Sequence, residues 1–407
     1  MIYLSAFEYS AMLRLSKHLG AITPDPVRHW IAIDKELGAR HMFTIGEPDP
    51  IPREVLQVYA QAVYEEELSG KVSYPPVKGE DVLRKAVVNT ERNFNVNYAD
   101  DDFERIHLTV GGSQALQFIF SVFEKGSEII ALMPCWGTIF NMMAHSGVRG
   151  VPAELFKDGA FIKENAVKAL SKKTQAVYVN FPANPNGMVP PEKAVKEFTQ
   201  WAVANELQII SDAPYKYLIY DTLKTPYVSP LNFGAEAGRK TTEISSFSKV
   251  IKPDIRLGFI RLAPDILEHC DAKHLVYFFR NLSAGVSRPS QIGVAAVLKK
   301  DPFLSFLQPL VQRYREKAQL LQDYLEKMGC EVPEQPAGGY FLFPRTPNGM
   351  DGEAFVKEIA VKHKIGFIPG SSFGGNFKGF HHIRKYFRAG FGGGWTIEKI
   401  KAVFDSL

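Results

Sequence analysis

The sequence predicts an α/β fold in which a large domain with a mainly parallel sheet is joined to a smaller α+β domain. From residue 106 onward, apolar runs of strand length alternate with amphipathic segments of helix length, which is the order of elements in βαβ units. After Pro289 this alternation gives way to one long amphipathic helix and several short elements. The apolar and charged fractions of the 407 residues, 45% and 23%, are those of an ordinary globular protein.

The first 45 residues are expected to form a helical arm that packs with the smaller domain. A Thr-Pro-Asp-Pro motif at residues 23–26 interrupts this arm, because proline cannot continue a helix. Glu8, Arg14 and Lys17 break up the apolar N-terminus, so it lacks the uninterrupted apolar segment of a signal peptide.

The large domain is expected to be built from alternating strands and helices. Two helices precede this alternation, one at Pro52–Glu67 and one from about Glu80. Strands are expected at Ile106–Val110, Glu128–Met133, Ala176–Phe181, Gln208–Ser211 and Ile255–Leu262, and helices at Ser113–Phe123, Thr138–His145 and Glu192–Asn205.

The C-terminal part is expected to be the smaller α+β unit. The chain thus divides into an arm of residues 1–45, a large domain of residues 46–290 and a small domain of residues 291–407. The elements expected in the small domain are a helix at about Phe303–Met328, strands at Cys330–Val332 and Tyr340–Phe343, a helix at Asp351–His363, and two short strands ending near Arg388.

Charge and cysteine content argue against several classes of protein. A formal net charge of +4 without a basic stripe argues against nucleic-acid binding, and no apolar run reaches the length of a membrane span. Cys135, Cys270 and Cys330 are far apart and form no CxxC pair, which argues against a disulfide framework and a metal site. We therefore expect a cytoplasmic protein without a metal ion, a nucleic-acid partner or a membrane partner.

Polar residues at the carboxyl ends of the expected strands mark the candidate site, because ligands of open α/β sheets bind there. A Gly-Gly-Ser-Gln run at residues 111–114 leads from the first strand into a helix, where exposed amides and the positive helix end can hold a phosphate. An ordinary glycine turn capped by Ser113 is the alternative. Trp136, after the second strand, can offer its indole face to a planar ligand or belong to the core.

Two reactive groups follow later strands. Asp212 ends a buried strand, where an unpaired carboxylate is costly, so we expect a cation to meet it. Lys249 lies in a Ser-Phe-Ser-Lys turn beside a strand, where a primary amine can capture a carbonyl group; a solvated lysine is the alternative. With Arg256, these residues supply a phosphate seat, a stacking ring, a carboxylate for a ring nitrogen and a Schiff-base amine, which match pyridoxal phosphate.

Eight motifs carry a resemblance to a known family: Ile45–Asp49, Tyr74–Gly79, Gly111–Leu116, Pro134–Trp136, Asn184–Gly187, Asp212–Tyr215, Ser246–Lys249 with Arg256 and Gly258, and Arg388–Phe391. In this order they resemble the class I/II aminotransferases of the fold-type-I pyridoxal-phosphate enzymes, over nearly the whole chain. The resemblance implies a large domain with a mixed sheet of seven strands. The seven-residue step from Lys249 to Arg256 is similar to that of the 2-aminoadipate and kynurenine transaminases.

The resemblance implies that the chain moves an amino group between an L-amino acid and a 2-oxo acid. Lys249 would hold the cofactor as a Schiff base and, once freed, move the proton at the substrate Cα. Asp212 would pair with the ring nitrogen and Trp136 would stack on the ring. Tyr215 and Asn184 would hydrogen-bond the ring 3′ oxygen.

The resemblance also implies how the phosphate and the substrate are held. Arg388 would take the substrate α-carboxylate with a bidentate fork, helped by Asn184 and by the backbone near Gly46. Tyr74 would reach the phosphate from a neighbouring subunit, which would make the active unit a homodimer. The other phosphate contacts would come from the backbone amides around Gly112, Ser113 and Gln114, and from Ser246 and Arg256.

Some features depart from the family pattern or leave the reaction open. Asn186 stands where Thr or Ser is usual, and Asp254 stands where Gly is common. Arg280 or Arg288 would either bind an acidic substrate side chain or be a surface or interface charge. A lyase, synthase or oxidase is the alternative function, because the cofactor supplies the chemistry on the same scaffold. A regulatory module would need a DNA-binding domain before Gly46, for which the segment is too short.

Overall fold

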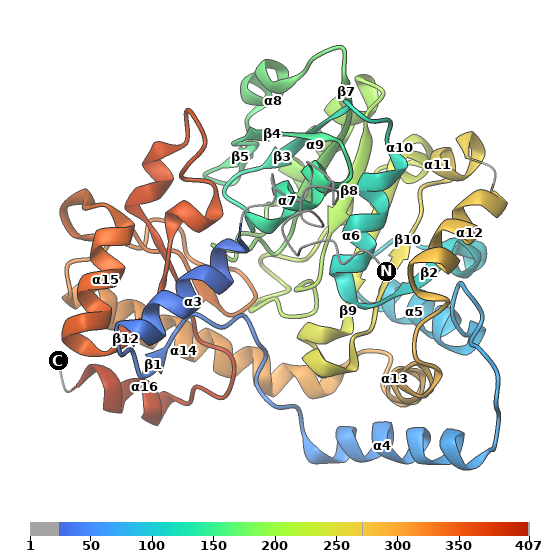
Figure 1. The fold of residues 1–407 in the computed structure, drawn as a ribbon, viewed down its shortest axis with the longest axis horizontal. Helices are drawn as coiled ribbons and strands as arrows, with labels where there is room; N and C mark the ends of the chain where they lie inside the picture. Colours follow the sequence, from blue (N-terminus) through green and yellow to red (C-terminus); the bar gives the residue numbers. More distant parts are fainter. Residues whose placement is uncertain (1–23, 271, 406–407) are drawn as a thin grey trace, which may run out of the picture.

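The computed structural model describes residues 24–270 and 272–405, and its main feature is one seven-stranded sheet (Figure 1). All neighbouring strands are parallel except at β10, which runs antiparallel to both β2 and β9. The expected mixed, mainly parallel sheet of seven strands is therefore confirmed. In spatial order its strands are β2 (Ile106–Thr109), β10 (Gly258–Arg261), β9 (Thr241–Ser246), β8 (Gln208–Asp212), β7 (Thr174–Asn180), β3 (Glu128–Leu132) and β4 (Arg149–Ala153).

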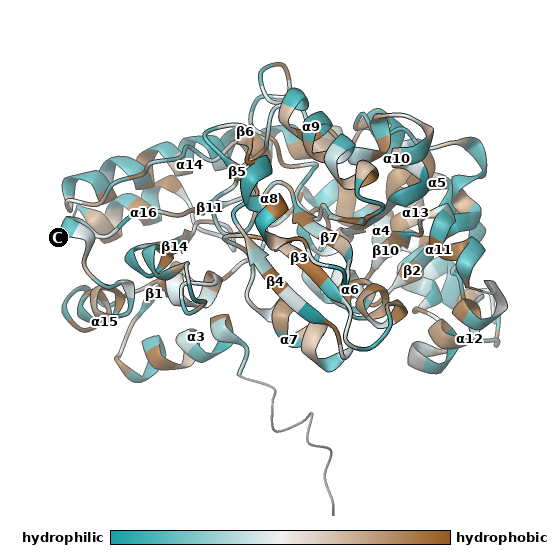
Figure 2. Ribbon diagram, turned by 90° about the horizontal axis from the view of Figure 1, so that it is seen from above, coloured by the Kyte–Doolittle hydropathy of each residue, from teal (hydrophilic) through white to brown (hydrophobic). Residues whose placement is uncertain are grey.

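Helices bury the central strands of this sheet. Every residue of β3 and β9 is buried, as expected for strands covered on both faces. The helix α6 (Gly111–Val122) packs against β9 and β10, and α9 (Glu192–Ala204) packs against β8. Figure 2 shows the corresponding pattern: β3 is largely hydrophobic, whereas α9 mixes hydrophobic and hydrophilic residues.

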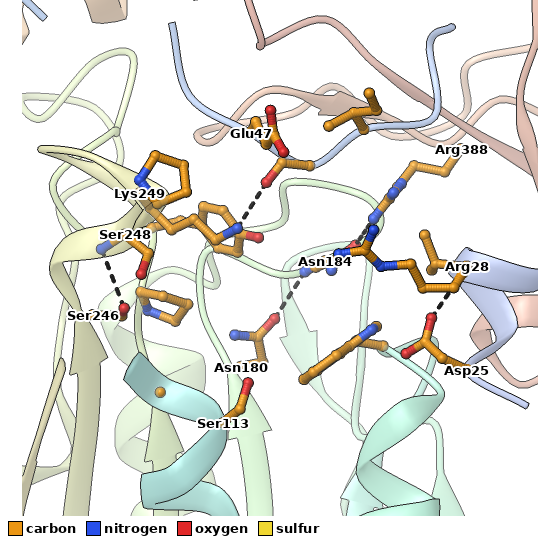
Figure 3. A pocket seen from close by; sticks show the side chains of 18 of the residues that line it. Asp25, Arg28, Glu47, Ser113, Asn180, Asn184, Ser246, Ser248, Lys249 and Arg388 are labelled. Carbon is orange, nitrogen blue, oxygen red and sulfur yellow. Dashed lines mark hydrogen bonds between the residues drawn. The ribbon is translucent and has the colours of Figure 1, made fainter. Parts of the chain in front are cut away.

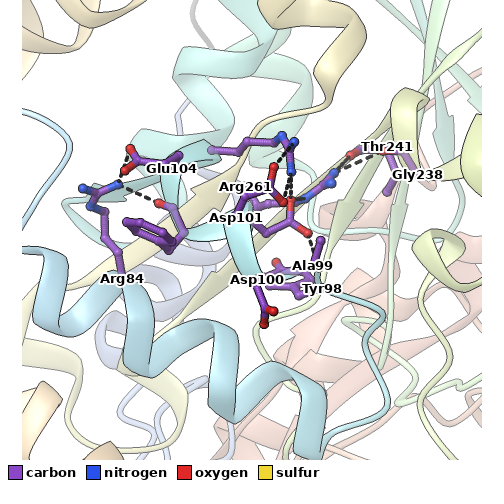
Figure 4. Close-up of polar contacts among 12 residues, drawn as sticks. Arg84, Tyr98, Ala99, Asp100, Asp101, Glu104, Gly238, Thr241 and Arg261 are labelled. Carbon is purple, nitrogen blue, oxygen red and sulfur yellow. Dashed lines mark hydrogen bonds and ion pairs between the residues drawn. The ribbon is translucent and has the colours of Figure 1, made fainter.

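A polar cluster ties the 3-10 helix η1 (Asp100–Arg105) to strand β10 (Figure 4). Arg261 of β10 donates from Nε to Asp102 Oδ1 at 2.8 Å and from Nη1 to the backbone oxygen of Thr241 at 2.9 Å. Arg84 donates to the backbone oxygen of Phe103 at 2.6 Å. These contacts fix the segment from which the chain enters β2.

The second unit combines C-terminal elements with the N-terminal helix α3 (Pro26–Glu36), which packs against β12 and β13. β1 (His41–Met42) pairs in parallel with β12. Figure 1 shows α3, β12 and α15 grouped at the left of the molecule. The C-terminal elements are η5 (Ser305–Leu307), α14 (Gln308–Lys327), β11 (Phe341–Leu342), η6 (Pro347–Gly349), α15 (Gly352–His363), β12 (Ile365–Gly366), β13 (Ile368–Pro369), η7 (Gly370–Phe373), η8 (His381–Lys385), β14 (Phe387–Gly390) and α16 (Ile397–Phe404).

Helix α13 (Arg288–Lys300) lies with the large sheet rather than with the C-terminal unit. It packs against α4 (Arg53–Leu68) and α5 (Asp81–Asn93). The division expected between residues 290 and 291 falls inside this helix, so we propose that the two units divide after α13.

Other differences from the expected elements are local. The strand expected at Cys330–Val332 reduces to a single bridge between Glu331 and Arg345. The strand expected from Ile255 begins only at Gly258, because η4 (Pro253–Ile255) and a left-handed Arg256 with φ of 48° come first. The pattern did not predict β4, β9, β5 (Phe156–Lys157), β6 (Ala160–Phe161), α8 (Lys163–Ala169), η2 (Pro230–Asn232), α10 (Ala235–Lys240), η3 (Phe247–Lys249), α11 (Pro264–His269) and α12 (Ala272–Ser283).

Three further expectations bear on the class of protein. None of the helices in the described part of the chain is both long and apolar enough to cross a membrane. Within the same residues, no group of three or more His, Cys, Asp or Glu side chains could hold a metal ion. The three cysteines are free thiols. Of the helical arm expected over residues 1–45, the described part contains α3, and residues 1–23 lie outside the described residues.

Candidate active site

A cavity of about 460 Å³ opens at the carboxyl ends of β7, β8 and β9, where the C-terminal unit and α3 meet the large sheet (Figure 3). It lies where ligands of open α/β sheets bind. Most of the residues that the sequence singled out line it: Gly46, Gly112, Ser113, Trp136, Asn184, Asp212, Tyr215, Ser246, Lys249, Arg256 and Arg388.

Lys249 ends the short 3-10 helix η3 that follows β9, and this turn directs its amine into the cavity. Its Nζ donates to the backbone oxygen of Gly46 at 2.7 Å and lies 5.8 Å from the centre of the Tyr215 ring. Burial, with a smaller effect from the positive charge of Arg388, lowers the pKa of Lys249 to about 8. About a tenth of the amine is therefore neutral, and nucleophilic, at pH 7.

Asp212 is the last residue of β8, and its carboxylate faces the same cavity. Its Oδ2 accepts hydrogen bonds from Tyr178 Oη at 2.8 Å and Asn180 Nδ2 at 3.4 Å. Burial raises the pKa of Asp212 to about 7, against the lowering effect of the Tyr178 hydrogen bond. We expected a cation to pair with Asp212, but among residues 24–270 and 272–405 no side chain forms an ion pair with it. The carboxylate therefore has no counter-ion in direct contact.

Arg388, on β14, is almost fully buried at 2% exposure. It donates from Nη1 to Asn184 Oδ1 at 2.9 Å and from Nη2 to the backbone oxygen of Thr44 at 2.8 Å. Its Nε has no hydrogen-bond partner within the described chain, although it is buried. Burial lowers the pKa of Arg388 to about 10, which still leaves it charged at neutral pH.

The start of α6 and the side chain of Arg256 lie next to each other and form a candidate anion-binding site. Gly111, with φ of 69°, lies so close to Arg256 that a Cβ on it would come within 2.4 Å of Nη2. Arg256 Nη1 donates to Ser248 Oγ at 3.1 Å and to the backbone oxygen of Pro253 at 2.7 Å, which holds the guanidinium there. Ser113 lies in the first turn of α6, so amides, a hydroxyl and a guanidinium gather where an anion is favoured.

The capping of α6 differs from the simple alternative considered for Ser113. The residue before the helix is Val110, which offers no side-chain cap. The Gln114 side chain turns back instead, and its Oε1 accepts from the Val110 backbone N–H at 2.7 Å. The Ser113 side chain is therefore left to face the cavity, and the Gln114 side chain is not.

Tyr215 and Trp136 add rings to the walls of the cavity. Tyr215 is buried, and its ring meets Tyr340 and Phe341 edge-on with centres 5.6 Å apart in each case. Burial raises the pKa of Tyr215, while the nearby positive charge of Arg388 lowers it. Trp136 is only half-buried, so its indole is accessible from the cavity.

Several residues that line or support the site were not singled out in advance. Asn180 is the last residue of β7, and its Oδ1 accepts a hydrogen bond from the Asn184 backbone N–H at 2.9 Å. Because polar residues at the carboxyl ends of strands mark ligand sites in open α/β sheets, Asn180 could have been predicted from the sequence. Tyr178, two residues earlier, supports Asp212. Asp25 and Arg28 enter from α3, which no local pattern connects with the sheet.

Three other residues from the sequence lie away from the cavity of this chain. Tyr74 is 86% exposed. Arg280 is exposed on α12. Arg288 donates from Nε to Glu80 Oε1 at 2.7 Å and from Nη2 to the backbone oxygen of Tyr74 at 3.1 Å, so it fixes the segment that carries Tyr74. Neither arginine lines the cavity.

Comparison with known sequences gives the same family along most of the chain. The sequence profile described as "Aminotransferase class I and II" matches residues 43–407. A Pyrococcus abyssi protein named aspartate aminotransferase is 26% identical over 376 residues, which cover 91% of this chain and 93% of the relative. A Thermococcus litoralis protein named aromatic-amino-acid aminotransferase 2 is also 26% identical, with the same coverage of both chains.

Solved structures share the fold. A Thermus thermophilus aspartate aminotransferase structure with maleate has a TM-score of 0.83 at 22% identity and covers 97% of this chain and 98% of its own. A Methanococcus jannaschii structure, described as similar in its active site to kynurenine aminotransferases, has a TM-score of 0.79 at 25% identity and covers 96% and 98%. The chain therefore belongs to the class I and II aminotransferase family and is a transferase of amino groups.

Proposed function

We propose that this aminotransferase uses pyridoxal phosphate, bound at Lys249, to move an amino group from an L-amino acid to a 2-oxo acid. The observation that carries the proposal is the meeting of Lys249, Asp212 and Arg388 in one cavity, from three distant parts of the chain. An amine that is partly neutral, a buried carboxylate without a cation and a buried arginine with a free donor have no evident structural reason to share a cavity.

The residues present fit the cofactor group by group. The candidate anion-binding site between α6 and Arg256 can bind the cofactor's phosphate group. Asp212 lacks an ion pair among the described residues and suits a protonated ring nitrogen. Trp136 can stack on the ring, and the amine of Lys249 suits the aldehyde.

Arg388 and Lys249 would have different roles in the reaction. When bound, the cofactor serves as an electron sink for the carbanion formed at the substrate Cα. Arg388 would bind the substrate α-carboxylate, using the Nε that is free in the described chain, and so fix the direction of the Cα–H bond. Lys249 would move the proton from Cα, since its pKa of about 8 suits a general base near neutral pH.

We also propose that the active unit is a homodimer. The helix α4 spans 16 residues, none of which is buried within this chain, and it lies at the bottom edge of Figure 1. Tyr64, Leu68, Val72 and Tyr74 are 58%, 68%, 98% and 86% exposed, which is a cluster of apolar side chains along one segment. Such a surface is typical of an interface, and it would let Tyr74 reach the phosphate of a second copy.

A cytoplasmic location also remains part of the proposal. The three cysteines are free, and two of them, Cys135 and Cys330, are buried, with pKa values that burial raises. Unreactive free thiols of this kind suit a reducing compartment.

A single-turnover experiment tests the proposed reaction. Holoenzyme mixed with one amino acid and no oxo acid should change the cofactor from its aldehyde-derived form to its amino form, with one equivalent of 2-oxo acid released. A second oxo acid should then restore the starting absorbance. Release of ammonia, hydrogen peroxide or carbon dioxide in place of this exchange would favour a lyase or an oxidase instead.

A further inference from the structure

The cavity segment, residues 43–49, supplies backbone acceptors to the two side chains on which the proposed reaction depends most. Four of its residues line the cavity. Arg388 Nη2 donates to the backbone oxygen of Thr44 at 2.8 Å, and Lys249 Nζ donates to that of Gly46 at 2.7 Å (Figure 3). The place of this short segment therefore affects the direction of both the guanidinium and the amine.

The cavity segment depends on other parts of the chain for its position. From residue 45 onward its backbone has no regular secondary structure. At its first end, the Phe43 N–H donates to the Gly366 oxygen at 3.0 Å, and the Phe43 oxygen accepts from the Gly390 N–H at 2.7 Å. Tyr340 Oη donates to the middle of the segment at 3.1 Å.

The second end of the cavity segment is held by Asp49, which contacts α14 and the loop before α16. Its Oδ2 accepts from Lys317 Nζ at 2.5 Å, and its Oδ1 accepts from the Gly394 backbone N–H at 3.0 Å. Its backbone N–H donates to Tyr314 Oη at 2.6 Å. Asp49 does not line the cavity, and the proposed reaction uses only Gly46 of the sequence motif that Asp49 ends.

Lys317 connects the two ends of the cavity segment. Its Nζ also donates to the backbone oxygen of Trp395 at 2.8 Å. The Trp395 ring stacks on Phe43, with centres 4.0 Å apart, and its Nε1 donates to the Met42 oxygen at 3.3 Å. One buried cation thus holds Asp49 directly and Phe43 through Trp395.

The burial of this ion pair is not explained by stability. The side chains of Lys317 and Asp49 are 2% and 10% exposed. Taking two charges out of water costs about as much free energy as their attraction returns, so a buried ion pair often adds little net stability. What the pair can contribute instead is a fixed position for the segment that Asp49 ends.

We propose that Asp49 and Lys317 are positioning residues for the reaction, because their ion pair fixes the backbone oxygens that orient Arg388 and Lys249. The inference rests on the proposed function, which gives Arg388 the substrate α-carboxylate and Lys249 the proton at Cα. Neither Asp49 nor Lys317 lines the cavity, so both act through the cavity segment.

Two single variants and their double variant separate positioning from stability. Asp49→Leu and Lys317→Met each leave a buried charge unpaired, so each should lower the midpoint of urea unfolding. The double variant has no unpaired charge and should recover most of that loss. The single-turnover rate at saturating amino acid should nevertheless fall about 10- to 100-fold in all three, because a small misplacement of reacting groups is costly.

Leu321→Ala is the matched control for a loss of stability. Leu321 is fully buried on α14, one turn after Lys317, and it does not line the cavity. This variant should lower the unfolding midpoint as the single variants do, because it leaves a cavity in the core. Its single-turnover rate per bound cofactor should stay within about threefold of wild type.

Binding of butyrate gives a readout that does not depend on turnover. Butyrate carries a carboxylate for Arg388 but no amino group, so it cannot react. Its Kd for the holoenzyme should rise about tenfold in Asp49→Leu, Lys317→Met and the double variant, and stay unchanged in Leu321→Ala. If a single variant fails to fold, the double variant decides.

The failure of this inference and the failure of the proposed function give different results. If the double variant recovers both its stability and the wild-type rate, or if Leu321→Ala loses as much rate and butyrate affinity, the positioning role is wrong and the proposed function stands. If wild-type enzyme converts amino acids without forming the amino form of the cofactor, the proposed function itself is wrong. Recovered stability without recovered rate or butyrate affinity supports both.

Discussion

Lys249 shows how the surroundings of one residue set its chemistry. The sequence alone places this amine on a turn after a strand, where a solvated lysine is equally reasonable. In the structure, burial and the charge of Arg388 disfavour its ammonium form, while the Gly46 backbone oxygen at 2.7 Å holds the amine in the cavity. Burial disfavours the charged form of Asp212 as well, but for a carboxylic acid this raises the pKa, to about 7.

The capture of the cofactor by Lys249 should depend on pH. Only the neutral amine attacks an aldehyde, and the pKa of Lys249 is lowered from 10.5 to about 8, so the neutral fraction grows as the pH rises toward 8. The second-order rate at which cofactor-free protein binds pyridoxal phosphate should therefore rise about eightfold between pH 6.5 and 7.5 and level off above about pH 9. Stopped-flow absorbance measures it. A rate that still climbs steeply between pH 9 and 10 would indicate an ordinary solvated lysine.

At the scale of elements, a buried charge network connects the turn after β8 with its neighbours. Lys216 follows Tyr215 directly, and its Nζ donates to Glu91 of α5 and, at 2.6 Å, to Glu243 of β9. All three side chains are fully buried. Tyr217 donates to Glu91 and Ser229 to Glu243, so every carboxylate has at least two partners. The network joins the strand that ends at Asp212 with the strand that leads to Lys249.

Removing the cation from this network should be costly. Lys216→Met leaves two carboxylates buried side by side, which should lower the free energy of unfolding by about 3–5 kcal/mol. Lys224→Met is the matched control, because its side chain is 81% exposed and should change the free energy by less than about 0.5 kcal/mol. Urea unfolding followed by circular dichroism compares the two. Similar midpoints for both variants would show that the network contributes little.

At the scale of the whole molecule, the cavity is assembled by packing between distant segments. α3, the Thr44–Glu47 segment and β14 bring Arg28, Gly46 and Arg388 against the carboxyl ends of the large sheet. The proposed second copy would add Tyr74. Each site of a symmetric dimer would then contain Lys249 from one chain and Tyr74 from the other.

Mixing two inactive variants tests this shared site. Lys249→Ala should be inactive, and Tyr74→Ala should bind the phosphate poorly. When the two are unfolded and refolded together, half of the dimers should be mixed, each with one intact site, which restores about a quarter of wild-type activity. If the phosphate site lies within a single chain, no mixed dimer has an intact site and no activity should return. Each variant refolded alone is the control.

The sequence predicts the parts of this protein that depend on local pattern. The apolar strands β3, β7 and β8 and the residues just after them were found because strand ends and turns leave local signals. The polar strand β9 was missed, since its Glu243 is buried only through the Lys216 network. Arg28 was missed as well, because its place in the cavity depends on how α3 packs against β12 and β13, far away in sequence.

Covalent trapping shows whether Lys249 holds the cofactor. Holoenzyme is reduced with sodium borohydride, digested, and its peptides are mapped by mass spectrometry. We expect a stable pyridoxyl group on Lys249, and none on that peptide when the holoenzyme has first been treated with an amino acid substrate. A pyridoxyl group on another lysine, or none on Lys249 in the untreated enzyme, would contradict it.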